Sequence, residues 1–197
     1  MADQEVLDVT LQVARALSTI GLDYVVGGSL ASSMHGIPRS TQDVDILVFM
    51  FHEDVEPLVS ALDDDFYVDE DAVRDAVDRS SSFNVIHFET AFKVDLFVAD
   101  DEPWLAEERN RRQSIGITDS GESVDVSSAE DNILHKLQWY QKGGEISDQQ
   151  WRDVLGVMKV QGDDLDLSYL DKWARRLGLQ ELLAQALSEA GLAGGAS

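Results

Sequence analysis

The stretch that decides the fold is YVVGGSLASSMHGIPRSTQDVDILV, residues 24–48. It begins with a short apolar run that predicts a buried strand, and the chain then turns at Gly27-Gly28-Ser29. SLASSMHG after the turn predicts a short helix, and DVDILVF, residues 43–49, predicts a second strand. The stretch therefore predicts a strand, a helix and a strand in succession.

The Gly-Gly turn offers a place for an anion. At the start of a helix, free backbone N–H groups and the helix dipole favour a phosphate group, and glycine lets the backbone approach it closely. Gly27, Gly28 and Ser29 are therefore candidates for binding phosphate. A Gly-Gly sequence between a strand and a helix is also common as a plain turn, so both interpretations stay open.

Asp43 and Asp45 stand at positions i and i+2 of the second predicted strand. Side chains at this spacing point to the same face, with their Cα atoms roughly 6.5–7 Å apart. Two like charges side by side are costly to bury unless a cation neutralises them. We expect Mg²⁺, with Mn²⁺ as a substitute, because Mg²⁺ prefers carboxylate and phosphate oxygens. A strand edge that faces water is the alternative.

A third carboxylate is expected near such a pair, because two-metal phosphoryl chemistry needs a group that accepts the proton of the incoming hydroxyl. Asp95 is the candidate, since it interrupts the apolar run FKVDLFV, residues 92–98. Its neighbours Val94 and Leu96 point to the opposite face, and an exposed strand residue is the alternative. Residues 83–88 and 92–98 predict an antiparallel hairpin because only three residues join them.

From Ser127 onward the pattern predicts helices only. Ser127 and Glu130 match the capping box that opens a helix. We place a domain boundary at 126/127, with a catalytic core at 1–126 and a helical segment packed on it at 127–197. The fold class is therefore α+β, with a mixed β-sheet flanked by helices and followed by a C-terminal helical segment.

Lys136 borders the inward face of its predicted helix, which is an unusual place for one of only five lysines. A contact with a triphosphate would explain the position. A lysine that extends along the surface and pairs with Glu130, Asp131 or Asp153 would explain it equally well. Both interpretations stay open.

The composition narrows the function classes. The chain has 197 residues, 44% of them hydrophobic, no cysteine and a formal net charge of -23. The lack of cysteine excludes disulfides, thiolate nucleophiles and Cys-ligated zinc. The negative charge repels polyanions, so extensive nucleic-acid binding is not supported. No apolar run is long enough for a membrane helix and no signal sequence is present, so we expect a cytoplasmic protein.

The four histidines show no zinc-ligand spacing. Each is expected to be a packing or surface residue. His87 is the exception to consider, because it lies on the predicted strand next to that of Asp95 and would then line the same pocket.

These residues together carry a resemblance to a known family. The order of Gly-Gly-Ser, then D-x-D on the following strand, then one Asp on a later strand resembles the DNA polymerase beta-like nucleotidyltransferase superfamily. More narrowly, GGSLASSMHG followed by RSTQDVDI resembles the AbiE-type nucleotidyltransferases, a group that includes toxins of toxin–antitoxin pairs. The resemblance covers residues 24–48 well, 92–98 adequately and 128–160 more loosely.

The resemblance implies a Mg²⁺-dependent enzyme that moves a nucleoside monophosphate from an NTP, such as ATP, to a hydroxyl group. The acceptor, whether RNA, protein or small molecule, is not identified by any residue. Gly28 and Ser29 would hold the triphosphate, and Asp43 and Asp45 would bind both metal ions. Asp95 would complete one metal site and act as the base.

Four further residues enter through the same resemblance. Arg39 and Thr41 lie in the R-x-T-x-D-x-D stretch, where Arg39 would pair with a phosphate or remain an exposed loop residue. Similar proteins of the AbiE type use a lysine and an aspartate at the nucleotide site, roles that would fall to Lys136 and Asp153. An antitoxin would be the protein partner. A nucleotide sensor without turnover and a transferase acting on aminoglycoside-like molecules are the alternative functions.

Overall fold

The computed structural model of the chain describes residues 2–41, 43–118 and 121–192. The chain divides into two compact units. The sheet unit comprises Met1–Gly27 and Ser40–Val126, and the helical unit comprises Gly28–Arg39 and Ser127–Ser197. The segment Gly28–Arg39 therefore groups with the C-terminal helices, although it lies early in the sequence.

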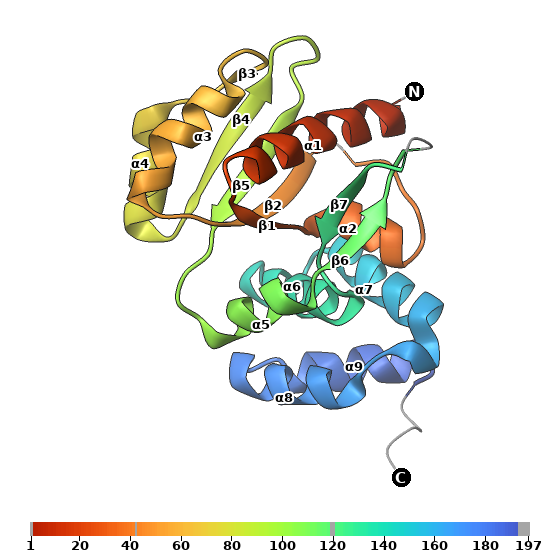
Figure 1. Cartoon of the computed structure of the whole chain (residues 1–197). Helices are drawn as coiled ribbons and strands as arrows, with labels where there is room; N and C mark the ends of the chain where they lie inside the picture. Colours follow the sequence, from red (N-terminus) through yellow and green to blue (C-terminus); the bar gives the residue numbers. More distant parts are fainter. Residues whose placement is uncertain (1, 42, 119–120, 193–197) are drawn as a thin grey trace. The chain divides into compact units, whose positions relative to one another are not determined.

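A mixed sheet forms the centre of the sheet unit (Figure 1). Its strands in chain order are β1 (Asp23–Val26), β2 (Asp43–Phe49), β3 (Phe66–Tyr67), β4 (Ser82–His87), β5 (Lys93–Val98), β6 (Gln113–Gly116) and β7 (Ser123–Val126). In the described residues these seven strands have the spatial order β3-β4-β5-β2-β1-β7-β6. The pairs β2–β5 and β1–β7 are parallel and the others are antiparallel, so the predicted mixed sheet is confirmed.

The core of the sheet unit lies on one face of the sheet. Val44, Ile46 and Val48 of β2 are fully buried, whereas the residues between them are partly exposed. This alternation arises because successive side chains of a strand point to opposite faces. Helices pack against the sheet. The helices of this unit are α1 (Ala2–Thr19), α3 (Val55–Leu62), α4 (Glu70–Arg79) and α5 (Pro103–Arg111), with a short 3-10 turn η1 (His52–Asp54).

The helical unit is built around α2 (Gly28–His35), which contacts α6 and α7. Its remaining elements are α6 (Ala129–Lys142), α7 (Asp148–Gln161), the 3-10 turn η2 (Gly162–Asp164), α8 (Leu167–Leu177) and α9 (Gln180–Ala190). The end of α2 is fixed by polar contacts as well, since His35 Nε2 lies 2.7 Å from the Ser127 carbonyl oxygen. Gln161 donates to the His35 carbonyl oxygen at 2.7 Å.

Several predicted elements are confirmed. The strand, helix and strand of residues 24–48 are β1, α2 and β2, and β4 and β5 pair as the predicted antiparallel hairpin. The strand β3 was not predicted, because two residues are too few to show an alternating pattern. None of the helices in the described part of the chain has the length and hydropathy that a membrane span requires.

The predicted capping box at the start of α6 is wrong by one residue. Ser128, not Ser127, is the N-cap, and its hydroxyl oxygen accepts from the Asp131 backbone N–H at 3.1 Å. The Ser128 hydroxyl also donates to the Asp131 carboxylate at 2.6 Å. Glu130 is used elsewhere, because its carboxylate accepts from the Asp166 backbone N–H at 2.8 Å. Two adjacent serines followed by two adjacent acids fit the pattern in either register, so the sequence alone does not choose between them.

The contact between α2 and α7 depends on a glycine. A Cβ atom at Gly36 would lie 2.8 Å from the Val157 backbone nitrogen and 3.0 Å from the Gly156 carbonyl carbon. We expect Gly36→Ala to lower the free energy of unfolding by about 1–3 kcal/mol, because backbone atoms must move to admit the methyl group. The shift of the urea unfolding midpoint measures the effect.

Gly156→Ala is the matched control. A Cβ atom at Gly156 would meet Ile37 side-chain atoms at 3.6 Å or more, which is ordinary contact. Alanine is also the better helix former by about 1 kcal/mol, so this variant should be as stable as the wild type or more so. Equal unfolding midpoints for the two variants would contradict the proposed steric constraint.

Candidate active site

Three carboxylates share one face of the sheet. Asp43 and Asp45 alternate along β2 with the fully buried Val44 and Ile46, so both acids point away from the core. Asp95 of β5 lies directly opposite Asp45 in the parallel register. Residues opposite each other on neighbouring strands share a face, so the sheet brings the three carboxylates to the same side near the start of two strands.

A lysine lies among these acids. Lys93 stands opposite Asp43 in the same register, and its ammonium group forms an ion pair with Asp95 Oδ2 at 2.5 Å. The hydrogen bond with Asp95 raises the pKa of Lys93 above its ordinary value, while burial acts in the opposite direction. The negative charges of Asp95, Asp43 and Asp45 add to the rise. The Lys93 ammonium is therefore within the electrostatic field of all three carboxylates.

Backbone contacts fix the position of the acids. The Thr41 hydroxyl donates to the Asp43 carbonyl oxygen at 2.8 Å and lies 3.3 Å from Asp43 Oδ1. The Gly27 backbone N–H donates to the Asp45 carbonyl oxygen at 2.8 Å. Thr41 and Gly27 thus hold β2 at the two residues that carry its carboxylates.

The donor chemistry of this face fits a hard divalent cation. Carboxylate oxygens on a partly exposed surface are the ligands that Mg²⁺ and Mn²⁺ prefer, and such ions complete their coordination with water or phosphate oxygens. Asp43, Asp45 and Asp95 are the residues that would hold the ion. Within the described ranges, no group of three or more His, Asp or Glu side chains lies in a metal-binding arrangement, these three acids included, so their side chains would have to converge to hold an ion together.

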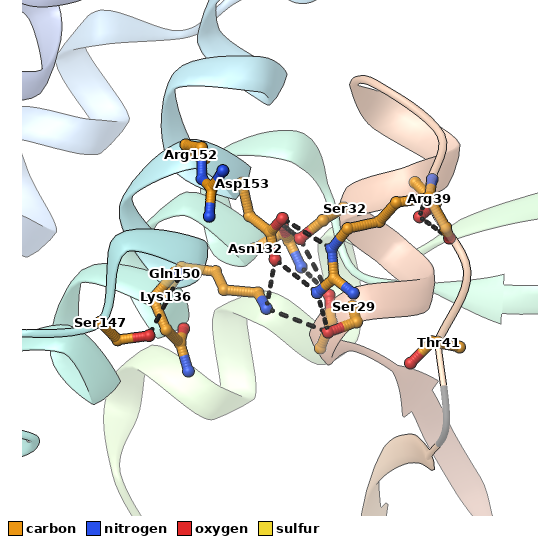
Figure 2. A network of polar contacts seen from close by, with 12 residues as sticks. Ser29, Ser32, Arg39, Thr41, Asn132, Lys136, Ser147, Gln150, Arg152 and Asp153 are labelled. Atoms are coloured by element: carbon orange, nitrogen blue, oxygen red, sulfur yellow. Dashed lines mark hydrogen bonds and ion pairs between the residues drawn. The ribbon is translucent and has the colours of Figure 1, made fainter.

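A second cluster lies at the N-terminus of α2 in the helical unit (Figure 2). Gly28 has a φ of +58°, a left-handed conformation that favours glycine. Ser29 lies in the first turn, and its hydroxyl oxygen accepts from Arg39 Nη2 at 2.5 Å. Lys136 Nζ lies 3.4 Å from the same oxygen. Figure 2 shows the Arg39 and Lys136 side chains reaching Ser29 from opposite sides.

Asp153 joins the two cations of this cluster. Arg39 binds it in a bidentate manner, with Nε 2.9 Å from Oδ1 and Nη2 2.8 Å from Oδ2. Lys136 Nζ lies 2.9 Å from Oδ2. The side chains of Lys136 and Asp153 are each only 7% exposed, and that of Arg39 is 27% exposed. Arg39 is therefore not a free loop residue, and Lys136 has Asp153 as an ion-pair partner.

The environment of Asp153 favours its charged form. Burial acts to raise the pKa of this carboxyl group, but the hydrogen bonds and positive charges of Arg39 and Lys136 outweigh burial and lower the pKa below its ordinary value. Two cations and one anion leave the cluster with an excess of positive charge beside the positive end of the α2 dipole. Such a place is suited to a phosphate group.

Some residues of these two clusters were not predicted from the sequence. Asn132 donates to the Gly28 carbonyl oxygen at 3.1 Å and accepts from the Ser32 hydroxyl at 2.9 Å, which ties α6 to the start of α2. Nothing in its sequence context distinguishes it from any other helical asparagine. Lys93 could have been predicted from the sequence as a neighbour of the acids, because it stands two residues before Asp95 and so shares its face of the strand.

His87 does not line the site of the acids, so that alternative is wrong, and the packing role expected of the histidines holds for this one. Asn84 lies opposite Asp95 in the β4–β5 register, and His87, three residues further along the strand, points to the other face. There the His87 ring is buried against Phe66, with ring centroids 5.2 Å apart. His87 Nδ1 lies 2.9 Å from the Thr90 hydroxyl oxygen, so the residue packs in the core and also contacts the turn between β4 and β5.

Solved structures with a similar fold carry nucleotidyltransferase descriptions. An antigenic nucleotidyltransferase-like protein from Paracoccidioides brasiliensis has 19% identity and a TM-score of 0.58, with 95% of this chain and 94% of that chain covered. The antibiotic-resistance factor ANT(2'')-Ia has 14% identity and a TM-score of 0.59, with coverage of 94% and 99%. A crystal structure of ANT(2'')-Ia contains adenylyl-2''-tobramycin.

No protein-family model matches the sequence, and no curated protein matches it either. The structural likeness extends over almost the whole length of both ANT(2'')-Ia and this chain. At these identities the likeness concerns the fold. The chain has a nucleotidyltransferase-like fold.

The role of Asp153 can be tested by stability. We expect Asp153→Asn to lower the free energy of unfolding by about 3 kcal/mol at neutral pH, because two largely buried cations lose their common counter-ion. Since folding lowers the pKa of Asp153, its contribution is complete above the unfolded value of about 3.9 and is lost as the pH falls through the folded value. The difference between wild type and variant should therefore shrink below about pH 4.

Urea unfolding of both proteins across a pH series measures this difference. Asp171→Asn on α8 is the control, because Asp171 forms an ion pair with Arg175 on the exposed surface, where such pairs contribute little. A constant difference between wild type and Asp153→Asn down to the acid transition would contradict the assigned ion pairs.

Proposed function

We propose that the chain is a metal-dependent nucleotidyltransferase that moves a nucleoside monophosphate from an NTP to a hydroxyl group of an acceptor. One observation carries the proposal. Asp43, Asp45 and Asp95 lie in register on one face of adjacent strands in a nucleotidyltransferase-like sheet. Three carboxylates gathered on one face repel one another, so a cationic ligand would stabilise the arrangement.

The proposed reaction is a displacement at the α-phosphorus of the NTP. The acceptor hydroxyl oxygen forms a bond to this phosphorus while the bond to the bridging oxygen of the β-phosphate breaks, and pyrophosphate leaves. The Asp95 carboxylate takes the hydroxyl proton as general base. Mg²⁺ held by Asp43 and Asp45 would supply positive charge that neutralises the phosphate oxygens and favours ionisation of the hydroxyl.

We assign the triphosphate to the cluster at the start of α2. Gly28 and Ser29 would offer backbone N–H groups to it, and Lys136 and Arg39 would offer charge-assisted hydrogen bonds. Asp153 would hold the two cations in position rather than touch the nucleotide, because it already accepts from both of them.

The net charge bears on the acceptor. At -23 the protein repels a polyanion such as RNA and attracts a cation, so a cationic small molecule is the acceptor that the charge favours. The ANT(2'')-Ia structure with adenylyl-2''-tobramycin has a nucleotidylated product of this kind, which supports the same choice by likeness of fold. A nucleotide sensor without turnover is the second function, and it requires binding without transfer.

Transfer can be followed with NTPs labelled at the α-phosphate or at the γ-phosphate, offered with Mg²⁺ and with RNA, protein and polyamine-like acceptors. We expect the α label to reach the acceptor. Asp95→Asn should lower kcat by about 10²–10⁴-fold, because the proton acceptor is lost. Asp78→Asn removes the same charge from the exposed surface of α4 and should leave kcat unchanged.

Transfer of the γ label alone would refute nucleotidyl transfer in favour of a kinase. Unchanged transfer in Asp43→Asn and Asp45→Asn would refute the metal assignment. Tight binding of an NTP without transfer to any acceptor would favour the sensor.

We also propose, on the AbiE-type resemblance of residues 24–48, that the activity belongs to a toxin–antitoxin or defence setting with a protein antitoxin as partner. Expression of the chain in a bacterial host should then arrest growth. Asp45→Asn should relieve the arrest, because it removes a proposed metal ligand. Normal growth during expression of active wild-type protein would contradict a toxin role and leave the transferase assignment intact.

A further inference from the structure

The face of the sheet that carries Asp43, Asp45 and Asp95, here called the carboxylate face, also carries the ammonium group of Lys93. Lys93 Nζ lies 2.5 Å from Asp95 Oδ2, and Lys93 stands directly opposite Asp43 in the β2–β5 register. Its side chain is 46% exposed, whereas that of Asp95 is 20% exposed. The ammonium group therefore reaches the acids from the solvent side, on a side chain that has room to move away.

We infer that Lys93 is a resident counter-ion of the carboxylate face, which competes with a divalent metal ion for Asp95 and so sets the metal affinity of the site. The inference rests on the proposed function, because it takes Asp43, Asp45 and Asp95 as the metal ligands. It adds a residue that neither the sequence pattern nor the proposed chemistry requires.

The competition follows from charge and from geometry. Three carboxylates with one ammonium group carry a net charge of about −2, and without the ammonium group about −3, so a divalent ion is attracted more strongly when a neutral side chain replaces Lys93. The ammonium group also occupies a lone pair of the Asp95 carboxylate that a metal ion would use. Both effects weaken metal binding, and both end when the lysine side chain turns toward solvent.

The competition predicts that neutral substitutions of Lys93 strengthen metal binding. Titration of the full chain with Mn²⁺ alone, with free Mn²⁺ followed by electron paramagnetic resonance, measures the dissociation constant without any need for substrate. We expect Lys93→Met and Lys93→Gln to tighten Mn²⁺ binding by roughly tenfold. Lys93→Arg keeps the charge and should bind Mn²⁺ as the wild type does.

Two controls separate the site from the acidic surface as a whole. Lys159→Met removes the same charge from an exposed position of α7 and should leave the Mn²⁺ dissociation constant unchanged. Asp45→Asn should weaken Mn²⁺ binding, and the binding that remains measures the background of the acidic surface. The rise in melting temperature on addition of Mn²⁺ is a second readout, and it should be larger for Lys93→Met than for the wild type.

The outcomes distinguish a failure of the role of Lys93 from a failure of the metal site itself. Weaker binding in Asp45→Asn together with unchanged binding in Lys93→Met would overturn the role of Lys93 and keep the metal site. Tightening by Lys93→Arg as large as that by Lys93→Met would also overturn it, because the charge would then not be the cause. Wild-type Mn²⁺ binding in Asp45→Asn would overturn the metal site and, with it, the inference.

Discussion

The parallel register between β2 and β5 orders both faces of the sheet. It sets Asp45 opposite Asp95 on one face and aligns the buried Val44, Ile46 and Val48 with Val94, Leu96 and Val98 on the other. A shift by one residue would turn the acids inward and the apolar side chains outward. Burial of each apolar side chain contributes roughly 1.5–3 kcal/mol, so the core face outweighs the repulsion among three partly exposed carboxylates. The acids are thus gathered by the packing of residues that have no part in the chemistry.

In the helical unit, two positive charges rather than three negative ones are brought together. Arg39 and Lys136 converge on the start of α2, and burying two like charges together would be unfavourable without an anion. Asp153 supplies one negative charge for both, through the planar fork of the arginine and the single ammonium group of the lysine. Its presence lets the cations stay near the helix N-terminus, and the excess positive charge remains available to an anionic group.

The sequence predicted those features that depend on local periodicity. The bounds of β2, the hairpin of β4 and β5 and the common face of Asp43 and Asp45 follow from an alternation of two residues, which is strict in these strands. Features that depend on tertiary contacts were not accessible. The sequence left three acids open as partners of Lys136, because only the packing of α6 on α7 sets which of them its ammonium group reaches.

The errors have the same origin. Ser127 and Ser128 are equivalent in sequence, and the cap is settled by the backbone conformation at Ser128. His87 was tied to Asp95 through their neighbouring strands, but the register decides the face, and the register becomes known only when the strands are paired. Whether Gly27, Gly28, Ser29 and the three acids act on a nucleotide stays a prediction, since fold alone does not imply function.

The two clusters share a physical principle. In each, the protein supplies an internal group with the same sign of charge as the ligand that the cluster suits: the Lys93 ammonium among carboxylates, and the Asp153 carboxylate between two cations. Such a group offsets the repulsion between the like charges of the cluster, so the cluster is stabilised before its ligand binds. The cost is weaker ligand binding, since the internal partner must be displaced or share its contacts. Lys93, being half exposed, is the partner that can leave, whereas the buried Asp153 is expected to stay and share its cations with a phosphate.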